Sequence, residues 1–163
     1  MLMRFHAAEE DLAFMDAQIK QVIKSNEGCQ RLTALEGVGP IGAILIFATL
    51  GSGDAFKNGR EFSAYLGLTP KQYRSGGKTN VIGISRHVAN RRLRAVLIQG
   101  ARAYVHKHKQ VTSGKDEWLQ ALVARGGTGR AAVALANKNV RTAWAMLTQG
   151  TEYNCKPCVG NAA

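Results

Sequence analysis

The sequence has no long apolar segment and few cysteines. None of its 163 positions lies in a run of ~18 apolar residues, so we expect no transmembrane helix. Residues 1–4 lead into acidic residues rather than into an apolar stretch with a cleavage site, so no secretory signal is expected. The three cysteines are odd in number, and two of them, Cys155 and Cys158, lie in the last nine residues. They form no disulfide framework, and we expect a protein of the reducing cytosol.

Acidic residues are almost missing from the middle of the chain. Residues 55–115 contain thirteen lysines and arginines but a single acid, Glu61, whereas residues 1–54 carry a net charge of −3 and residues 116–163 a net charge of +2. A concentrated positive surface attracts polyanions, and counterion release from nucleic acid is a usual source of affinity. Charge that serves solubility alone is normally mixed in sign, so the pattern favours nucleic acid as the partner. A metal nuclease site needs clustered carboxylates, which this region cannot supply.

Residues 5–22 predict an amphipathic helix. Its apolar residues recur at alternating spacings of three and four, as do the a and d positions of a coiled coil: Phe5, Ala8, Leu12, Met15, Ile19 and Val22. The segment is too short to form a stable coil in isolation. It therefore packs on the domain or pairs with a partner helix, and we assign residues 1–28 to a coiled-coil-like helix.

A helix-hairpin-helix pattern follows. A short helix is expected to end at Gly37, residues 37–39 form a tight hairpin, and Pro40 suits the first turn of a second helix over about 40–50, where its missing N–H costs nothing. The second helix is apolar nearly all round and is expected to be buried. In such a motif the backbone at Gly37 and Gly39 can hold a DNA phosphate at a helix N-terminus. The alternative is a plain helical turn.

The next segments predict a helix and then a basic loop. Asn58 can cap a helix that runs to about Leu66, with Phe62, Tyr65 and Leu66 inward. Residues 71–84 have no helical period and contain three glycines, which indicates a loop or a short hairpin.

An arginine-rich helix is expected to follow, capped by Ser85 and running over about 86–106. Its polar face carries Arg86, Arg91, Arg92, Arg94 and Arg102. No acid on this helix can pair with them, so we expect phosphates to supply the countercharge.

Two more helices are predicted over 116–124 and 130–148, separated by a flexible break at 126–129. The fold class is thus mainly α, with one helical domain over 29–150. Residues 151–163 are expected to form a disordered tail.

The stretch QYRSGGKTN, residues 72–80, raises three alternatives: a phosphate-binding loop, a nucleophile on a flexible turn, or a hairpin. A Walker A loop needs its first glycine at position 72, where the chain has Gln72. A dinucleotide fingerprint fails likewise, because Phe56 stands where the third glycine after Gly51 and Gly53 belongs. The Cys155 and Cys158 pair is half of a zinc site, which needs four ligands, so no metal is expected to bind this chain.

Ser75 remains as a candidate nucleophile. Arg74 and Lys78 flank it, and positive charge stabilises a phosphoryl group in transfer. Gly76 and Gly77 would let a DNA backbone approach closely. On spacing alone, a Ser-Gly-Gly segment is more often an ordinary turn than a nucleophile.

Three segments together resemble a known family. GVGPIGAILIFATLG, then FKNGREFSAYLGLTPKQYRSGGKTNVIGISRHVANRRLRAVLIQGAR, then ALANKNVRTAWAMLTQGTEY resemble the C-terminal domain of insertion-sequence transposases. These are the DEDD-type enzymes related to the Piv DNA invertase, which include RNA-guided recombinases. The resemblance covers about residues 30–153, and the helix before it resembles the coiled coil that precedes this domain in the family.

The resemblance implies a division of labour. A separate RNase-H-like domain of the family supplies four acids that bind Mg²⁺, and the C-terminal domain supplies a serine that forms a covalent link to DNA. Ser75 matches that serine. The basic and glycine residues around it would hold DNA and, in some members, guide RNA: Lys71, Arg74, Gly76, Gly77, Lys78, Arg86, Arg91, Arg92 and Arg94. The acids of residues 1–54 do not resemble the metal site, so we expect a fragment that does not complete recombination alone.

The sequence therefore predicts the DNA-binding and serine-bearing part of a site-specific transposase in the bacterial cytosol, with DNA as partner and a homo-oligomer in the full-length enzyme. The alternative is a non-catalytic helix-hairpin-helix module that only binds nucleic acid.

Overall fold

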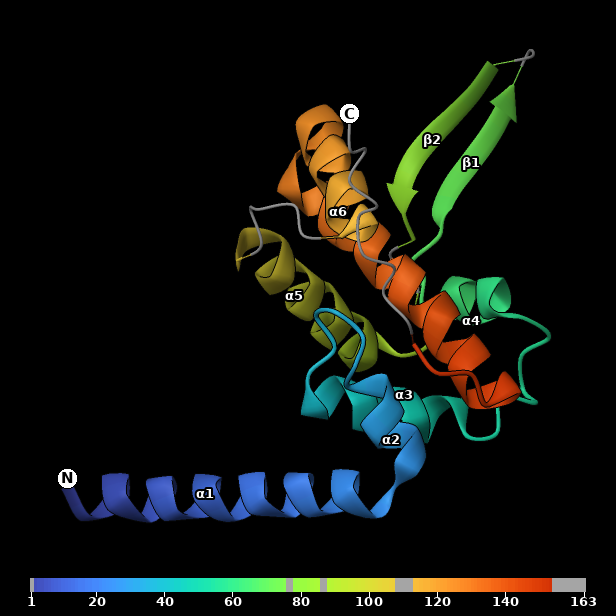
Figure 1. The fold of residues 1–163 in the computed structure, drawn as a ribbon. Coiled ribbons are helices and arrows are strands. Elements are labelled where there is room, and N and C mark those ends of the chain that lie inside the picture. Colours follow the sequence, from blue (N-terminus) through green and yellow to red (C-terminus); the bar gives the residue numbers. More distant parts are fainter. Residues whose placement is uncertain (1, 76–77, 86–87, 108–112, 154–163) are drawn as a thin grey trace, which may run out of the picture.

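The computed structural model describes residues 2–75, 78–85, 88–107 and 113–153, and for residues 2–3, 71–75 and 78–82 it describes the backbone alone. Within these ranges the chain forms six helices and one pair of strands, so it is mainly helical as predicted. Figure 1 shows a helical body with two projections: the first helix below it and the strand pair above it. Among the helices described, none combines the length and the apolar character that crossing a bilayer requires.

Helix α1 (Leu2–Ser25) lies largely outside the helical body. Several of its apolar side chains are exposed, among them Phe5 at 62 %, Leu12 at 67 % and Met15 at 60 %. Only its C-terminal turns lie against the following helices, where Ile19 and Ile23 are half-buried. The alternative in which this helix packs on the domain is therefore wrong for most of its length, because no described part of the chain covers its apolar stripe from Phe5 to Met15.

Helix α2 (Glu27–Leu32) is shorter than predicted. Asn26 caps its start by accepting a hydrogen bond from the Cys29 N–H, but the helix ends at Leu32 and not at Gly37. Tight turns replace the expected last turn, because the N–H groups of Leu35 and Val38 donate to carbonyls three residues earlier. Helix α3 (Pro40–Leu50) matches the prediction, with Pro40 in its first turn.

Helix α3 is only partly buried. Gly42, Ala43, Ile46 and Leu50 lie in the core, whereas Ile41 is exposed at 51 %. The expectation of complete burial is thus wrong for this side of the helix, since the elements packed on it cover one face only.

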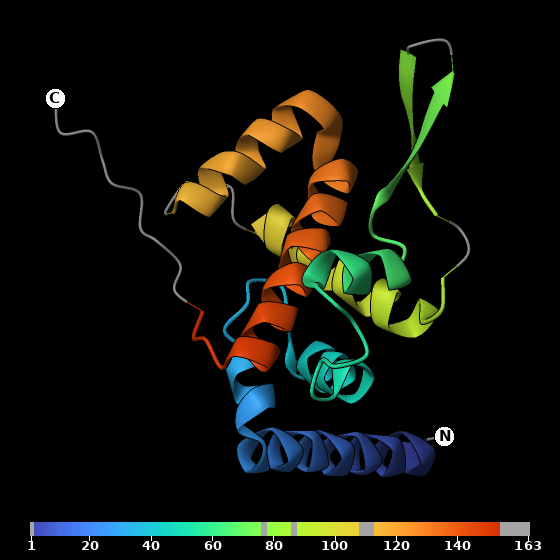
Figure 2. The same ribbon diagram turned by 90° about the vertical axis from the view of Figure 1, so that its right-hand side faces the viewer.

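Helix α4 (Gly59–Tyr65) begins as predicted, with the Asn58 side chain accepting from the N–H groups of Arg60 and Glu61. Phe62 and Leu66 are buried, but Tyr65 is exposed, so its expected inward position is wrong. Strands β1 (Pro70–Ser75) and β2 (Lys78–Ile84) then pair antiparallel where a loop or short hairpin is predicted. Figure 2 shows this pair leaving the helical body and projecting from it.

Helix α5 (Arg91–Lys107) starts later than predicted. Asn90, not Ser85, supplies the cap, since its side-chain oxygen accepts from the Leu93 N–H and its carbonyl from the Arg94 N–H. Helix α6 (Gly114–Gln149) is bent at Gly127, whose φ of 78° lies outside the helical region, so the predicted break falls inside one bent element. We call residues 114–126 its first arm and residues 128–149 its second arm; the bend is visible in Figure 2.

The core lies where α3, α4, α5 and the second arm of α6 meet. Its largest fully buried apolar side chains are Leu32, Leu35, Ile46, Phe62, Leu66, Leu68, Leu93, Leu135, Val140 and Met146. Burial of each such side chain contributes about 1.5–3 kcal/mol. This core fixes the base of the strand pair and the start of α5.

Candidate nucleic-acid interface

Ser75 is the last residue of β1, at the end of the strand pair that projects from the body. Its register partner on β2 is Lys78, and Arg74 pairs with Thr79. Lys71 lies near the base of the pair opposite Ile82. Gly76 and Gly77 lie outside the described residues. The backbone thus brings Ser75, Arg74 and Lys78 together at the tip of one arm.

Helix α5 is the next element after β2, and residues 85–90 connect the two. Arg91 and Arg92 are exposed in the first turn of this helix, as a role in phosphate binding requires. Arg86 lies outside the described residues. Arg102, farther along α5, is also exposed.

Arg94 is placed differently from its neighbours. It is half-buried, and its guanidinium donates a hydrogen bond to the Ser85 carbonyl. A Cβ built on Gly67, which has a φ of +63°, would lie 3.1 Å from the same guanidinium. Arg94 therefore ties the segment after β2 to the end of α4, a structural task that its place in an arginine-rich helix does not reveal.

The glycines of the predicted hairpin also differ from each other. Gly37 has a φ of +78°, and a Cβ built on it would lie 2.8 Å from the Gly100 carbonyl oxygen, so this glycine packs against α5. Gly39 is exposed and precedes α3 without a side-chain cap. Since Pro40 has no N–H, the free donors of this helix start are those of the next residues.

A largely buried polar network, which the sequence does not indicate, joins the turn at Glu36 to the start of α6, to its second arm and to Tyr153 beyond its end. The Lys115 ammonium donates to the Glu36 carboxylate, to the Asn139 side-chain oxygen at 3.1 Å and to the Tyr153 hydroxyl at 3.0 Å. The Tyr153 hydroxyl in turn donates to Glu36 at 2.7 Å, and Asn139 donates to the Glu36 carbonyl at 2.7 Å. Tyr153 thus contradicts the prediction of a tail that is disordered from Thr151 onward; residues 154–163 lie outside the described residues.

The charge of Glu36 is stabilised within this network. Burial by itself raises the pKa of the Glu36 carboxyl, but hydrogen bonds from Lys115 and Tyr153 and the positive charge of Lys115 outweigh burial. The pKa of Glu36 therefore lies below its ordinary value, and the carboxylate stays ionised as a structural partner of Lys115.

Further exposed cations, beyond those of the basic middle segment, lie on the second arm of α6. Arg130, Lys138 and Arg141 are eight and three residues apart, spacings that bring side chains to one face of a helix. The same periodicity is present in the sequence, but the small net charge of residues 116–163 hides it.

Comparison with known proteins identifies a family for this chain. The model of the IS116/IS110/IS902 transposase family matches residues 29–117. The chain belongs to this transposase family. The matched segment runs from α2 to the first turn of α6 and includes the strand pair with Ser75 and the arginine-rich helix α5.

Curated members of the transposase family are similar over almost the whole chain. The transposase of insertion sequence element IS1111A from Coxiella burnetii is 42 % identical over 147 residues, which are 90 % of this chain and 40 % of that protein. A probable family 20 transposase from Pseudomonas aeruginosa is 41 % identical over 145 residues, 89 % of this chain and 43 % of the relative. The transposase of IS1328 from Yersinia enterocolitica is 35 % identical over the same length. The chain thus spans about two fifths of the length of these relatives.

Proposed function

We propose that this chain is the serine-bearing, DNA-binding part of a site-specific transposase of the IS116/IS110/IS902 family. The observation that carries the proposal is the position of Ser75, at the tip of a projecting strand pair and inside the segment that the family model matches. A nucleophile on such an arm can reach a DNA strand while the helical body holds the flanking backbone. The relation to DEDD-type enzymes and to the Piv invertase belongs to the same proposal.

In this reaction the Ser75 hydroxyl oxygen attacks a phosphorus atom of the DNA backbone. A phosphoserine bond forms and the bond from phosphorus to one bridging oxygen breaks. A base takes the serine proton, and the released oxygen takes up a proton and leaves as the hydroxyl of the cleaved strand end. Arg74 and Lys78, next to Ser75 on the two strands, supply positive charge for the oxygens of the phosphoryl group.

The carboxylates of the described residues do not fit the Mg²⁺ that the family implies. No group of three or more potential metal ligands occurs in the described part of the chain. The two described acids that are not exposed already have partners, since the buried Asp116 accepts from Tyr104 and Ser113 and the half-buried Glu36 from Lys115 and Tyr153. The Mg²⁺-binding carboxylates of this proposal therefore belong to a separate RNase-H-like domain, and this chain alone is inactive in recombination.

The exposed apolar stripe of α1 supports a homo-oligomer in the complete enzyme. Phe5, Leu12 and Met15 repeat at coiled-coil spacing and lie open to solvent. DNA as substrate, guide RNA as a further partner, and the bacterial cytosol as the place of action complete the proposal.

The test is covalent capture of DNA by the enzyme reconstituted with its acidic domain. Ser75→Ala abolishes the protein–DNA adduct seen on a denaturing gel and leaves DNA binding nearly unchanged, because one hydroxyl contributes little to a phosphate-dominated interface. Ser52→Ala, at an exposed serine between α3 and α4, is the matched control and keeps the adduct. An adduct that persists in Ser75→Ala would overturn the nucleophile.

A second function, a non-catalytic nucleic-acid-binding module, is favoured by the start of α3. Gly39 is exposed there and no side chain caps the helix, as a phosphate-binding helix-hairpin-helix requires. This function predicts DNA binding that depends on Gly39 and no adduct under any condition.

A further inference from the structure

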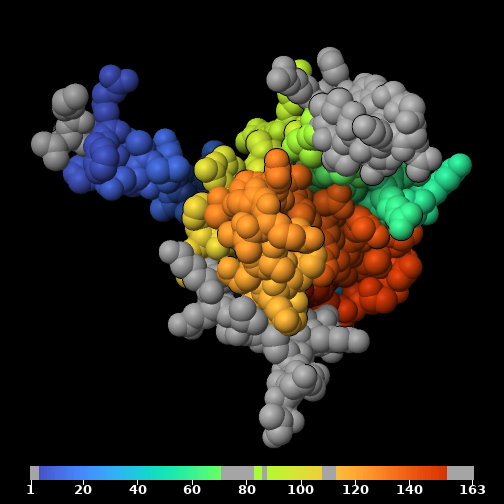
Figure 3. Space-filling view, turned by 90° about the horizontal axis from the view of Figure 1, so that it is seen from above, coloured from blue at the N-terminus to red at the C-terminus, as the bar shows by residue number. Residues whose placement is uncertain are grey.

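A groove runs between the second arm of α6 and the base of the strand pair. It has a volume of about 1450 Å³. Leu68, Pro70 and Ile84 line one side, and α6 residues from Gly126 to Ala145 line the other. The Asn137 side chain donates to the Leu68 carbonyl at 3.1 Å, which holds the two walls together. In Figure 3, α6 (orange to red) is exposed on this face of the molecule, with α4 (green) beside it.

The charge along this α6 groove has one sign. Arg130, Lys138 and Arg141 line it, no Asp or Glu among the described residues does, and all three cations are exposed. None of them takes part in an ion pair with another described residue; Lys138 instead lies over the Trp118 ring, 4.7 Å from its centroid. Cations without a protein countercharge favour an anionic ligand.

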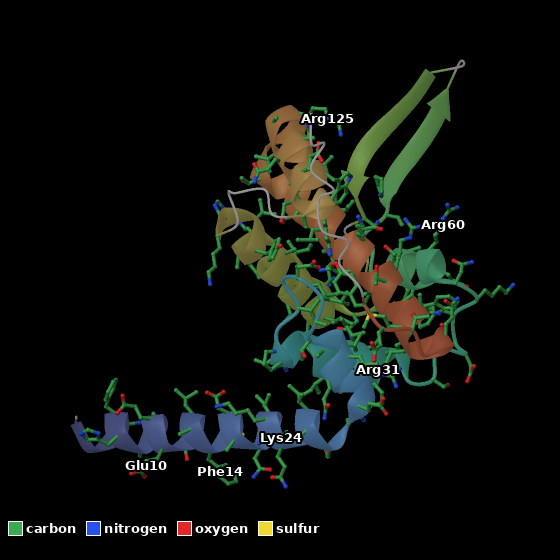
Figure 4. The ribbon with its side chains drawn as sticks, in the orientation of Figure 1. Glu10, Phe14, Lys24, Arg31, Arg60 and Arg125 are labelled. Carbon is green, nitrogen blue, oxygen red and sulfur yellow. The ribbon has the colours of Figure 1, made fainter. Side chains whose placement is uncertain are left out.

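More positive charge lies around the groove. Gly59 packs closely against Arg141, since a Cβ built on Gly59 would lie 2.9 Å from the Arg141 backbone. The N-terminus of α4, with its exposed Arg60, therefore lies beside this cation. Figure 4 shows Arg60 on α4 and Arg125 on the first arm of α6. Neither forms an ion pair within the described ranges.

The spread of the cations indicates a polymer. Arg130 and Arg141 are eleven residues apart on one helix, which corresponds to about 16 Å along its axis. A single phosphate group cannot bridge that distance, whereas successive phosphates of a nucleic acid can.

The floor of the groove distinguishes between single and double strands. Ile84, Val133 and Ala134 are half-buried apolar residues that line it, and the half-buried Trp118 ring adds an aromatic surface. A duplex keeps its base faces stacked and would leave this apolar surface uncovered. A single strand exposes base faces that stack on aromatic and apolar side chains while cations bind its backbone.

We propose that the α6 groove binds single-stranded nucleic acid, with Arg130, Lys138 and Arg141 on its phosphates and Trp118 against a base. The inference deepens the proposed function, on which it rests for the biological role of the strand, because transposition exposes unpaired strands close to the nucleophile. It adds a second surface to the one formed by the strand pair and α5.

The experiment measures binding by fluorescence anisotropy of a labelled single-stranded oligodeoxynucleotide, the RNA of the same sequence and the corresponding DNA duplex. In the double variant Arg130→Gln with Arg141→Gln, single-strand binding weakens roughly tenfold, and the slope of log K against log salt falls by about 1.4. Arg130→Lys with Arg141→Lys recovers most of the affinity. Lys20→Gln with Lys24→Gln on α1 removes the same charge from exposed positions outside the groove and changes the affinity by less than about twofold.

A second readout reports contact with the groove itself. Tryptophan emission falls when the single strand binds, and the fall is largely lost in Trp118→Phe, which keeps a stacking ring. Three results would each overturn the proposal. The α6 and α1 double variants could lose single-strand affinity equally. The duplex could bind as tightly as the single strand and be weakened as much by the α6 variants, or tryptophan emission could stay unchanged when the single strand is added.

Light scattering distinguishes a different occupant. If the α6 double variant changes the mass of the particle in the absence of nucleic acid, the groove holds a second copy of the chain and the proposal is wrong. The binding measurements need no covalent step, so their result does not depend on whether Ser75 forms an adduct. A groove that binds no nucleic acid would likewise not contradict Ser75 as the nucleophile.

Discussion

The two arms of α6 carry cations in opposite settings. On the first arm, Lys115 is only 8 % exposed and donates hydrogen bonds to Glu36, Asn139 and Tyr153. On the second arm, Arg130 and Arg141 are exposed and have no ion pair among the described residues. Both sets are cations of one helix. Burial makes the first a structural partner whose removal leaves a carboxylate without countercharge. Exposure leaves the second free to bind an external anion.

The largest expected effect on stability comes from removing the buried cation, Lys115. Lys115→Met leaves the Glu36 carboxylate partly buried with one hydrogen-bond donor fewer and no ion partner, and it lowers the free energy of unfolding by about 3 kcal/mol. Urea denaturation followed by circular dichroism measures this. The double variant Lys115→Met with Glu36→Leu is the control and regains part of the loss, because no charge is then left unpaired. Additive losses in the double variant would show that the two side chains are not coupled.

A smaller effect is expected from pH. The pKa of Glu36 is lowered in the folded state, so its contribution to stability is present above the unfolded pKa of about 4.3 and is lost as the pH falls through the folded value. Thermal melts of the parent protein between neutral pH and pH 3 therefore show an acid-side loss of stability that is reduced in Glu36→Gln. Glu9→Gln, at an exposed position of α1, serves as control and retains the acid-side loss. The same acid profile in Glu36→Gln as in the parent would exclude Glu36 as its source.

The smallest effect is expected from the exposed cations. Arg130→Gln with Arg141→Gln leaves the free energy of unfolding within about 0.5 kcal/mol of the parent, because neither guanidinium has a charged partner among the described residues. Urea denaturation under the conditions used for Lys115→Met makes the comparison direct. A loss as large as that of Lys115→Met would assign these arginines to the fold and not to binding.

Local signals in the sequence predicted several elements correctly. Pro40 begins α3 and Asn58 caps α4, since caps and first-turn prolines act through their own backbone neighbours. The glycines of residues 126–129 likewise predict the break at Gly127, because glycine adopts backbone angles that end a helix. The start of α5 was misplaced because Ser85 and Asn90 are both residue types that cap helices, and the side chain that caps α5 is that of Asn90.

The candidate site divides in the same way. The sequence alone determined the family resemblance, the basic middle segment and Ser75 between Arg74 and Lys78, because these depend on residue types and their order along the chain. Only the tertiary structure decided that Arg94 supports the fold, that Tyr153 packs on Glu36 and Lys115, and that Arg130 and Arg141 line a groove beside Ile84. Burial and countercharge arise between residues far apart in the chain, and they decide whether a cation stabilises the protein or binds its ligand.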